Sequence, residues 1–256
     1  MKRASGQLTR PTTRFTRVWR TARVIAHLVQ AAGIAGIGYP LMTPARRRIG
    51  LQRWSAKLVR HLAARLTVHG EPPHGVAPFM LVANHVSWLD IFAINAAVPT
   101  RFVAKSEVRH WPLVGWLCVK ADTLFIERER QRDLARLDDA MVNALRDEAG
   151  MGVFLEGTTT DGREVLPFHS SLLRPAQQAD APIYPVAIQY RRSDGSICTE
   201  AAYDGDKSVL DTLRLMLTQQ AFYVDVYFLP PIAASGKHRR EIASEARAQI
   251  VRQLYG

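Results

Sequence analysis

Beyond about Thr67, short apolar runs alternate with longer stretches in which apolar residues recur every three or four positions. Short apolar runs are typical of strands, and the three-to-four spacing is typical of helices with one buried face. The runs predict strands at 79–83, 102–104, 123–126, 152–155, 183–190 and 223–229, and the spacing predicts helices near 91–98, 111–120, 130–148, 170–178, 207–220 and 236–254. This alternation indicates an α/β fold, a mixed sheet flanked by helices.

The predicted strand 183–190 contains a proline, Pro185, in an otherwise apolar run. Proline has no N–H group to donate to a neighbouring strand, so it is found mainly on edge strands or at bulges. The pattern therefore predicts that this strand lies at an edge of the sheet or contains a bulge.

The first 66 residues differ in pattern from the rest, and we predict an N-terminal helical membrane-docking segment over 1–66 and a second domain over 67–256. Arginines recur at three- and four-residue intervals from Arg10 to Arg23, with Phe15, Val18 and Trp19 between them. The stretch from Val24 to Ala45 then has 22 residues and no charged side chain. That length could cross a bilayer.

Three glycines and one proline make this stretch a poor spanning helix: Gly33, Gly36, Gly38 and Pro40. We expect it to lie on one leaflet or dip into it, with a single span and an organelle transit peptide as the alternatives. From Leu51 to Leu66, leucines and Trp54 recur at helical spacing. This spacing predicts a second helix that lies beside the membrane or packs on the core.

The net charge of +11 is concentrated at the N-terminus. Residues 1–70 contain 14 Lys or Arg and no Asp or Glu, so residues 71–256 carry a charge of −3. A nucleic-acid enzyme would usually distribute its basic residues over its main domain. The distribution therefore argues against nucleic acid as a partner and favours anionic membrane lipids.

The two cysteines, Cys118 and Cys198, are too few for a disulfide framework and form no C-x-x-C motif. This usage indicates a reducing environment that faces the cytosol. The sequence shows no constellation of metal ligands, and we expect neither a metal nor a cofactor.

Asn84-His85-Val86-Ser87-Trp88-Leu89-Asp90 joins the predicted strand 79–83 to the helix near 91–98. Ligands and catalytic groups of α/β folds gather where strands end in this way. One tight turn would bring His85 and Asp90 together, so that the carboxylate fixes the imidazole tautomer and leaves one nitrogen free to accept a proton. On these residues alone, a hydrogen-bonding role for His85 at a helix start remains the alternative.

Further polar residues follow other predicted strands. Lys105 and Arg128 each follow a strand end, where they could bind a phosphate or another anion or could face solvent. Glu156, Gly157 and Thr158 follow the strand at 152–155. A carboxylate, a glycine and hydroxyl residues suit a loop that approaches a polar ligand closely, although a simple turn has the same composition.

Four motifs together resemble the glycerolipid acyltransferases, the family of bacterial 1-acylglycerol-3-phosphate acyltransferase. They are Asn84-His85-x4-Asp90, Phe125-Ile126-Glu127-Arg128, Phe154-Leu155-Glu156-Gly157-Thr158 and Tyr184-Pro185-Val186, in the order and spacing of the family. The resemblance covers roughly residues 65–230. It implies an enzyme at the cytoplasmic face of a bacterial inner membrane, either monotopic or with a single span.

The resemblance implies that His85, held by Asp90, is the general base that activates the free hydroxyl of a lysophospholipid. The hydroxyl oxygen would attack the thioester of acyl-CoA or acyl carrier protein, which are co-substrates, without an acyl-enzyme. Lys105 and Arg128 would bind the acceptor phosphate, and Glu156, Gly157 and Thr158 would shape the acceptor pocket. The expected reaction converts 1-acylglycerol-3-phosphate, lysophosphatidic acid, into phosphatidic acid.

Three positions depart from the family pattern. Leu155 stands where proline is usual, Thr159 where arginine is common, and His169 where lysine is frequent. Fewer cations beside the acceptor favour a headgroup with less phosphate, and lyso-ornithine lipid is the alternative acceptor. A non-catalytic lipid-binding protein of the membrane is the alternative from another functional class.

Overall fold

The structure is a computed structural model that describes residues 11–75, 78–126, 131–147 and 150–256 of the chain. Its strands are β1 (Ala64–His69), β2 (Phe79–Ala83), β3 (Arg101–Lys105), β4 (Leu124–Ile126), β5 (Gly150–Phe154), β6 (Ile183–Arg191) and β7 (Phe222–Phe228). Its α-helices are α1 (Arg14–Gly33), α2 (Pro44–His61), α3 (Asp90–Ala97), α4 (Val114–Lys120), α5 (Gln131–Arg146), α6 (Arg174–Gln178), α7 (Val209–Thr218) and α8 (Arg239–Tyr255). Shorter helical turns are η1 (Ile34–Gly38), η2 (Tyr39–Leu41), η3 (Ser106–His110) and η4 (Ser171–Leu173).

The seven strands form one sheet in the order β1-β7-β6-β2-β5-β3-β4. Only the β6–β7 pair is antiparallel among these neighbours, so β6, β2, β5, β3 and β4 all run in one direction. The predicted fold class, an α/β mixed sheet flanked by helices, is confirmed. Because parallel strands end at the same edge, the chain segments after β2, β5 and β3 leave the sheet side by side.

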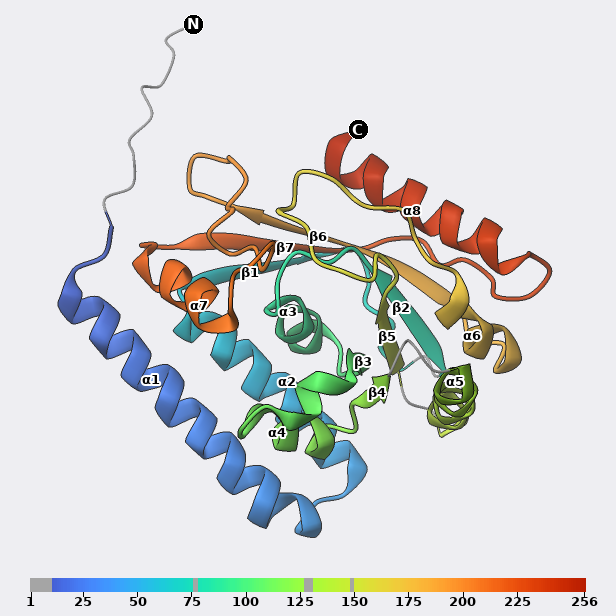
Figure 1. Cartoon of the computed structure of the whole chain (residues 1–256), viewed down its shortest axis with the longest axis horizontal. Helices are drawn as coiled ribbons and strands as arrows, with labels where there is room; N and C mark the ends of the chain where they lie inside the picture. The colour runs from blue at the N-terminus through green and yellow to red at the C-terminus, as the bar shows by residue number, and fades with distance from the viewer. Residues whose placement is uncertain (1–10, 76–77, 127–130, 148–149) are drawn as a thin grey trace, which may run out of the picture.

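Helices cover both faces of the sheet (Figure 1). Phe79, Leu81 and Ala83 of β2 pack with residues of α2, α3 and α7, whereas Met80 and Val82 pack on the other face with residues of α5, α6 and α8. A strand buried on both faces reads as an unbroken apolar run, which is the pattern of residues 79–83. The central strand that leads to His85 is thus held between two cores.

The N-terminal helices are tied to the body by specific contacts. The side chain of Thr12 donates to the carbonyl of Leu217 (2.8 Å), and Arg20 donates to the carbonyl of Gln219 (2.6 Å). Farther along α1, the ring of His27 stacks on Trp54 of α2 at 4.6 Å. The helical stretch Arg14–Leu41 is long and apolar enough to cross a membrane, yet one of its faces is docked against the protein.

Two predictions are wrong in detail. The helical spacing was expected to continue to Leu66, but α2 ends at His61 and Leu66 belongs to β1, which pairs with β7. Ala63 adopts a positive φ of 60°, and this turns the chain from helix to strand. The boundary proposed at residue 66 therefore falls inside a strand of the sheet.

Pro185 was expected to mark an edge or a bulge, but β6 lies between β2 and β7. Its antiparallel ladder with β7 begins at Val186, one residue after the proline. An inner strand accommodates Pro185 because the residue precedes this ladder, and its carbonyl still accepts a bond from the N–H of Leu229 (3.0 Å).

Candidate active site

His85 and Asp90 meet at the end of β2. The imidazole Nδ1 lies 2.8 Å from Asp90 Oδ2, and Asp90 is the first residue of α3. The tight turn expected between strand and helix therefore forms. Because Nδ1 faces the carboxylate, it carries the proton in the neutral ring, and Nε2 keeps its lone pair.

Asp90 is fully buried and its carboxylate accepts several hydrogen bonds. The backbone N–H groups of Val86 (2.8 Å) and Ser87 (2.9 Å) donate to Oδ2, and the hydroxyl of Tyr190 donates to Oδ1 (2.6 Å). These donors satisfy the hydrogen-bonding capacity of both oxygens of the buried carboxylate. Burial and the adjacent Asp90 raise the pKa of Tyr190 well above its usual value, so its hydroxyl keeps the proton that it donates.

The orientation of the His85 ring is set by an aromatic stack. The ring lies on Phe154 with 3.8 Å between centroids and 12° between planes, and Phe154 in turn lies on Phe102 at 5.6 Å. The His85 side chain is 21% exposed. The stack and Asp90 thus hold an imidazole that still has access to solvent.

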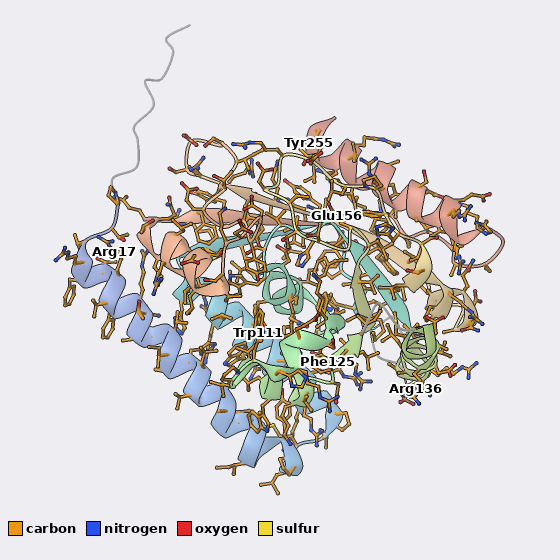
Figure 2. All side chains as sticks on the ribbon, viewed as in Figure 1. Arg17, Trp111, Phe125, Arg136, Glu156 and Tyr255 are labelled. Carbon is orange, nitrogen blue, oxygen red and sulfur yellow. The ribbon has the colours of Figure 1, made fainter. Side chains whose placement is uncertain are left out.

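Glu156 follows the end of β5 and holds the backbone of the turn that carries His85. Its Oε1 accepts from the backbone N–H of His85 (2.7 Å), and its Oε2 accepts from the N–H of Leu166 (2.8 Å). Burial raises the pKa of Glu156, and these two bonds partly oppose that rise. Glu156 is buried, and it lies near the centre of the view in Figure 2. Both oxygens contact the backbone, so the residue predicted to shape the acceptor pocket also fixes the position of His85.

Other loops close around the same turn. The Asn84 side chain makes two hydrogen bonds with the backbone of Ile188 on β6 (2.8 and 3.0 Å). The carbonyl of His85 accepts from the N–H of Thr160, and that of Val86 accepts from Tyr203. The backbone from 84 to 86 is therefore tied to β6 and to two loops that come from other parts of the sequence.

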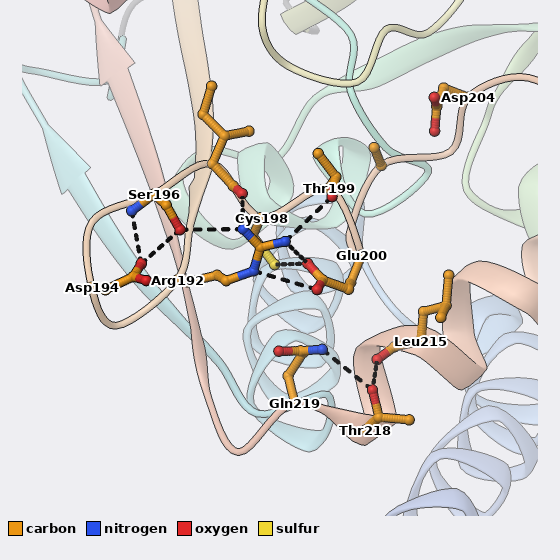
Figure 3. A network of polar contacts seen from close by, with 12 residues as sticks. Arg192, Asp194, Ser196, Cys198, Thr199, Glu200, Asp204, Leu215, Thr218 and Gln219 are labelled. Atoms are coloured by element: carbon orange, nitrogen blue, oxygen red, sulfur yellow. Dashed lines mark hydrogen bonds and ion pairs between the residues drawn. The ribbon is translucent and has the colours of Figure 1, made fainter. Parts of the chain in front are cut away.

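The loop that supplies Tyr203 is itself held by Arg192 (Figure 3). The Arg192 guanidinium pairs with Glu200 (2.7 Å) and also donates to Thr199 (3.3 Å). Thr159 donates its hydroxyl to the carbonyl of Tyr203, which joins this loop to the segment after β5. The hydroxyl of Thr159 is therefore already engaged in a hydrogen bond within the protein.

Three further predicted residues, Lys105, Gly157 and Thr158, lie at the same edge of the sheet, after or at the ends of β3 and β5. Gly157 has a φ of +78°, a conformation that favours glycine, and Thr158 is exposed. Lys105 is the exposed last residue of β3, and the structure shows no hydrogen bond or ion pair between it and the described residues of the site. Arg128 lies outside the described residues.

Tyr190 and the stacked ring of Phe102 were not predicted from the sequence. Tyr190 is 100 residues from Asp90 in the chain, and a tyrosine in an apolar strand carries no signal of the carboxylate that it contacts. The position of Phe102 depends on the pairing of β3 with β5, where it lies opposite Gly152. Both contacts follow from the strand order, which the sequence pattern does not specify.

The thiols do not provide a nucleophile for the site. Burial raises the pKa of Cys198 to about 12 and also raises the pKa of Cys118. A reactive cysteine requires the thiolate form near neutral pH. Both thiols stay protonated, and the arrangement supports proton abstraction by His85 without a covalent enzyme intermediate.

Comparisons with known proteins show which proteins this chain resembles. The profile of the family described as Acyltransferase matches residues 65–189. A lyso-ornithine lipid O-acyltransferase of Pseudomonas aeruginosa is 38% identical over 215 residues, which cover 84% of this chain and 81% of that protein. A 1-acyl-sn-glycerol-3-phosphate acyltransferase of Neisseria gonorrhoeae is 37% identical over 52% of this chain and 51% of its own length.

The fold also matches a solved structure. The crystal structure of the 1-acyl-sn-glycerophosphate (LPA) acyltransferase PlsC from Thermotoga maritima superposes with a TM-score of 0.72, covering 94% of this chain and 95% of that one. The two sequences are 21% identical, so this likeness concerns the fold, including the N-terminal helices.

Proposed function

Because this chain belongs to the acyltransferase family, we propose that it transfers an acyl chain from a thioester donor to the free hydroxyl of a lysolipid. The observation that carries the proposal is the His85–Asp90 pair, in which Nδ1 is held at 2.8 Å and Nε2 remains available. A histidine held in this way is suited to remove a proton from a hydroxyl group.

The reaction follows from that geometry in two steps. His85 Nε2 accepts the hydroxyl proton while the acceptor oxygen bonds to the thioester carbonyl carbon, and buried Asp90 stabilises the resulting imidazolium. The tetrahedral intermediate then breaks its carbon–sulfur bond, and the imidazolium returns the proton to the departing thiolate. The products are a lipid ester and a free thiol.

In this proposal the donor is acyl-CoA or acylated acyl carrier protein, since both are soluble thioesters. Such a donor meets a lipid acceptor at a membrane surface, and we place the enzyme at the cytoplasmic face of a bacterial inner membrane. Contacts of Thr12 and Arg20 with the C-terminal end of α7 and the residue after it, and of His27 with Trp54, favour a monotopic protein, because they hold α1 against the body.

We favour lyso-ornithine lipid as the acceptor. The Pseudomonas aeruginosa relative with that name matches more than four-fifths of both chains, whereas the Neisseria relative matches about half. The site also supports an acceptor without phosphate, since Thr159 replaces a common arginine and is bonded to Tyr203. The acceptor expected first from the sequence, 1-acylglycerol-3-phosphate, remains the second candidate because Lys105 is exposed at the same sheet edge.

The identity of the acceptor is tested by measuring the transfer of a radiolabelled acyl chain to a panel of lysolipids in detergent micelles. The acyl chain is supplied either on CoA or on acyl carrier protein. We expect transfer to lyso-ornithine lipid to exceed transfer to lysophosphatidic acid, and His85→Ala to lower both by about a hundredfold or more. His74→Ala, which removes an exposed histidine outside the site, is the matched control and should retain full activity. Preference for lysophosphatidic acid would reverse the order of the two acceptors.

The same panel tests the alternative of a non-catalytic lipid-binding protein. Binding of lysolipid without turnover of any acceptor, in folded wild-type protein with either donor, would favour that alternative. The buried and fully hydrogen-bonded Asp90 argues against it, because a lipid-binding role needs no oriented histidine.

A further inference from the structure

The connection between β3 and β4 exposes a group of large apolar side chains that the catalytic site does not use. We call them the α4 patch: Trp111 (37% exposed), Leu113 (41%), Val114 (38%), Trp116 (40%) and Val119 (43%). Five such side chains within nine residues form a concentration that a water-facing surface rarely carries. In the view of Figure 2, Trp111 and Tyr255 lie on opposite sides of the sheet.

The backbone holds this patch in place by an unfavourable conformation. Leu113 has a φ of +61°, which costs energy for a side chain that bears a Cβ. Next to it, a Cβ added at Gly115 would lie 2.1 Å from the carbonyl oxygen of Arg109, so only glycine lets η3 pack this closely on α4. The protein keeps this strained backbone at Leu113 even though it exposes the leucine side chain to solvent.

The α4 patch continues onto the N-terminal helices. The ring of Trp116 lies 3.6 Å from the place that a Cβ of Gly36 would occupy. The turns η1 and η2 there expose Ile37 (77%) and Leu41 (83%), at the end of the stretch that is apolar enough to cross a membrane. Figure 1 shows α4 on the same side of the sheet as α1 and α2.

Cations border this surface. Lys120 lies 5.7 Å above the Trp116 ring, Arg109 lies 5.7 Å from the Phe125 ring, and Arg47 lies 5.5 Å from the Tyr39 ring. Within the described segment 106–126 the acidic residues are Glu107 and Asp122, and Asp122 pairs with Arg101 at 3.4 Å. Tryptophan with basic residues at its border is the composition of proteins that rest at an anionic membrane surface.

We propose that the α4 patch is a second lipid-contacting surface, by which the catalytic domain itself rests on an anionic bilayer beside η1 and η2. The chain segment that carries the α4 patch begins after Lys105, the last residue of β3, at the sheet edge where His85 also lies. A contact that combines the N-terminal helices with the catalytic domain fixes the orientation of that edge toward the lipid. This inference goes beyond the acyl-transfer reaction and does not require it.

The test measures lipid contact with an environment-sensitive NBD label. The label is attached at Val119→Cys in a Cys118→Ala background, while buried Cys198 stays unlabelled because its pKa is raised to about 12. The full-length protein is added to phosphatidylglycerol–phosphatidylethanolamine vesicles with and without spin-labelled acyl chains. Leu41→Cys, on the exposed η2 turn, and Tyr255→Cys, on α8, are the two reference sites.

We expect the label at 119 to shift its emission to shorter wavelength and to lose intensity with the spin-labelled lipid, as the label at 41 does. The label at 255 should do neither. The proposal is overturned if the label at 119 stays in water, whether or not the label at 41 is quenched. The proposal is also overturned if the label at 119 is shielded from water in the absence of lipid and becomes exposed to water when the protein is diluted. A second copy of the chain would then cover the α4 patch.

A second measurement uses unlabelled protein. Trp111→Gln together with Val119→Gln should weaken binding to the same vesicles by about tenfold, as expected when two partly buried apolar contacts are lost. Tyr255→Gln, with a comparable exposed fraction of 43%, is the matched control and should bind as wild type. Equal binding of both variants would contradict the proposal, and catalytic activity enters neither measurement.

Discussion

At the scale of single residues, the site depends on how Asp90 is held. Its two oxygens accept from two backbone N–H groups, from His85 and from Tyr190, and the residue is fully buried. The His85–Asp90 contact could be predicted, because five positions and one turn suffice to form it. The Tyr190 contact could not, since it depends on where β6 lies relative to β2.

Tyr190→Phe removes the hydroxyl that donates to Asp90 Oδ1 and leaves that buried oxygen without this donor. We expect a loss of about 1–3 kcal/mol in the free energy of unfolding. A carboxylate with one donor fewer also holds the protonated imidazole more tightly, so the acid limb of the kcat/KM profile should move to higher pH. Urea denaturation and pH–rate measurements check the two effects.

The control is Tyr184→Phe on the same strand, since the Tyr184 hydroxyl makes no hydrogen bond to the described residues and its ring packs on Phe79. This variant should keep the wild-type pH profile. If Tyr190→Phe were destabilised without any change in that profile, Tyr190 would be a structural residue and would not position Asp90.

Glu156 should make stability depend on pH. Because burial raises its pKa above the ordinary value of 4.5, its contribution is fully present below that value and is lost as the pH rises through the raised pKa. The stability of wild type relative to Glu156→Gln should therefore fall from pH 4 to pH 7 in urea denaturation. Exposed Glu164→Gln in the same loop is the control. A relative stability that increased with pH would mean that the two N–H bonds outweigh burial.

At the scale of elements, apolar runs predicted six of the strands, because each is a short segment rich in apolar residues. The pattern missed β1, since its burial is uneven and its residues continue the helical spacing of α2. Ala63, which ends that helix with a φ of 60°, is a residue that ordinarily favours helix. The packing of β1 on β7 therefore overrides local preference at this point.

Gly152 of β5 controls the aromatic stack below His85. A Cβ at this position would lie 2.5 Å from Cε1 of Phe102, whose ring stacks on Phe154. We expect Gly152→Ala to displace both rings, to lower the free energy of unfolding by about 1–3 kcal/mol, and to reduce kcat. Thermal denaturation and steady-state kinetics measure the two losses.

Gly50→Ala is the matched control, because a Cβ at Gly50 of α2 meets nothing within 4 Å. Alanine in a helix should stabilise the protein by about 0.5–1 kcal/mol and leave kcat unchanged. A Gly152→Ala variant with wild-type kcat would show that the position of Phe154 does not affect His85.

At the scale of the whole molecule, α1 and α2, which carry many basic residues, lie on the same side of the sheet as α4 (Figure 1). The 14 basic residues among positions 1–70, with no acidic residue, could be read from the sequence. The α4 patch could not be, because a helical apolar pattern at 111–120 is equally typical of a helix buried in the core. Only the packing shows that these side chains remain exposed.

Membrane binding should therefore depend on lipid charge and on salt. Each Lys or Arg near an anionic surface contributes about 1 kcal/mol, so even two of them should make binding more than tenfold stronger on anionic than on zwitterionic vesicles. Sedimentation with vesicles should show this difference shrinking as NaCl is raised, since salt screens these charges. Equal binding to both kinds of vesicle at low salt would show that apolar insertion alone holds the protein.

The most direct test of the central claim is the rate of acyl transfer by His85→Ala under conditions in which wild type turns over its best acceptor. We predict a loss of about a hundred- to ten-thousandfold in kcat, the usual contribution of a general base, with the fold retained in circular dichroism. The Asp90 carboxylate would keep its donors from Val86, Ser87 and Tyr190 in this variant. A folded His85→Ala protein that transferred acyl chains within a few-fold of the wild-type rate would contradict the account.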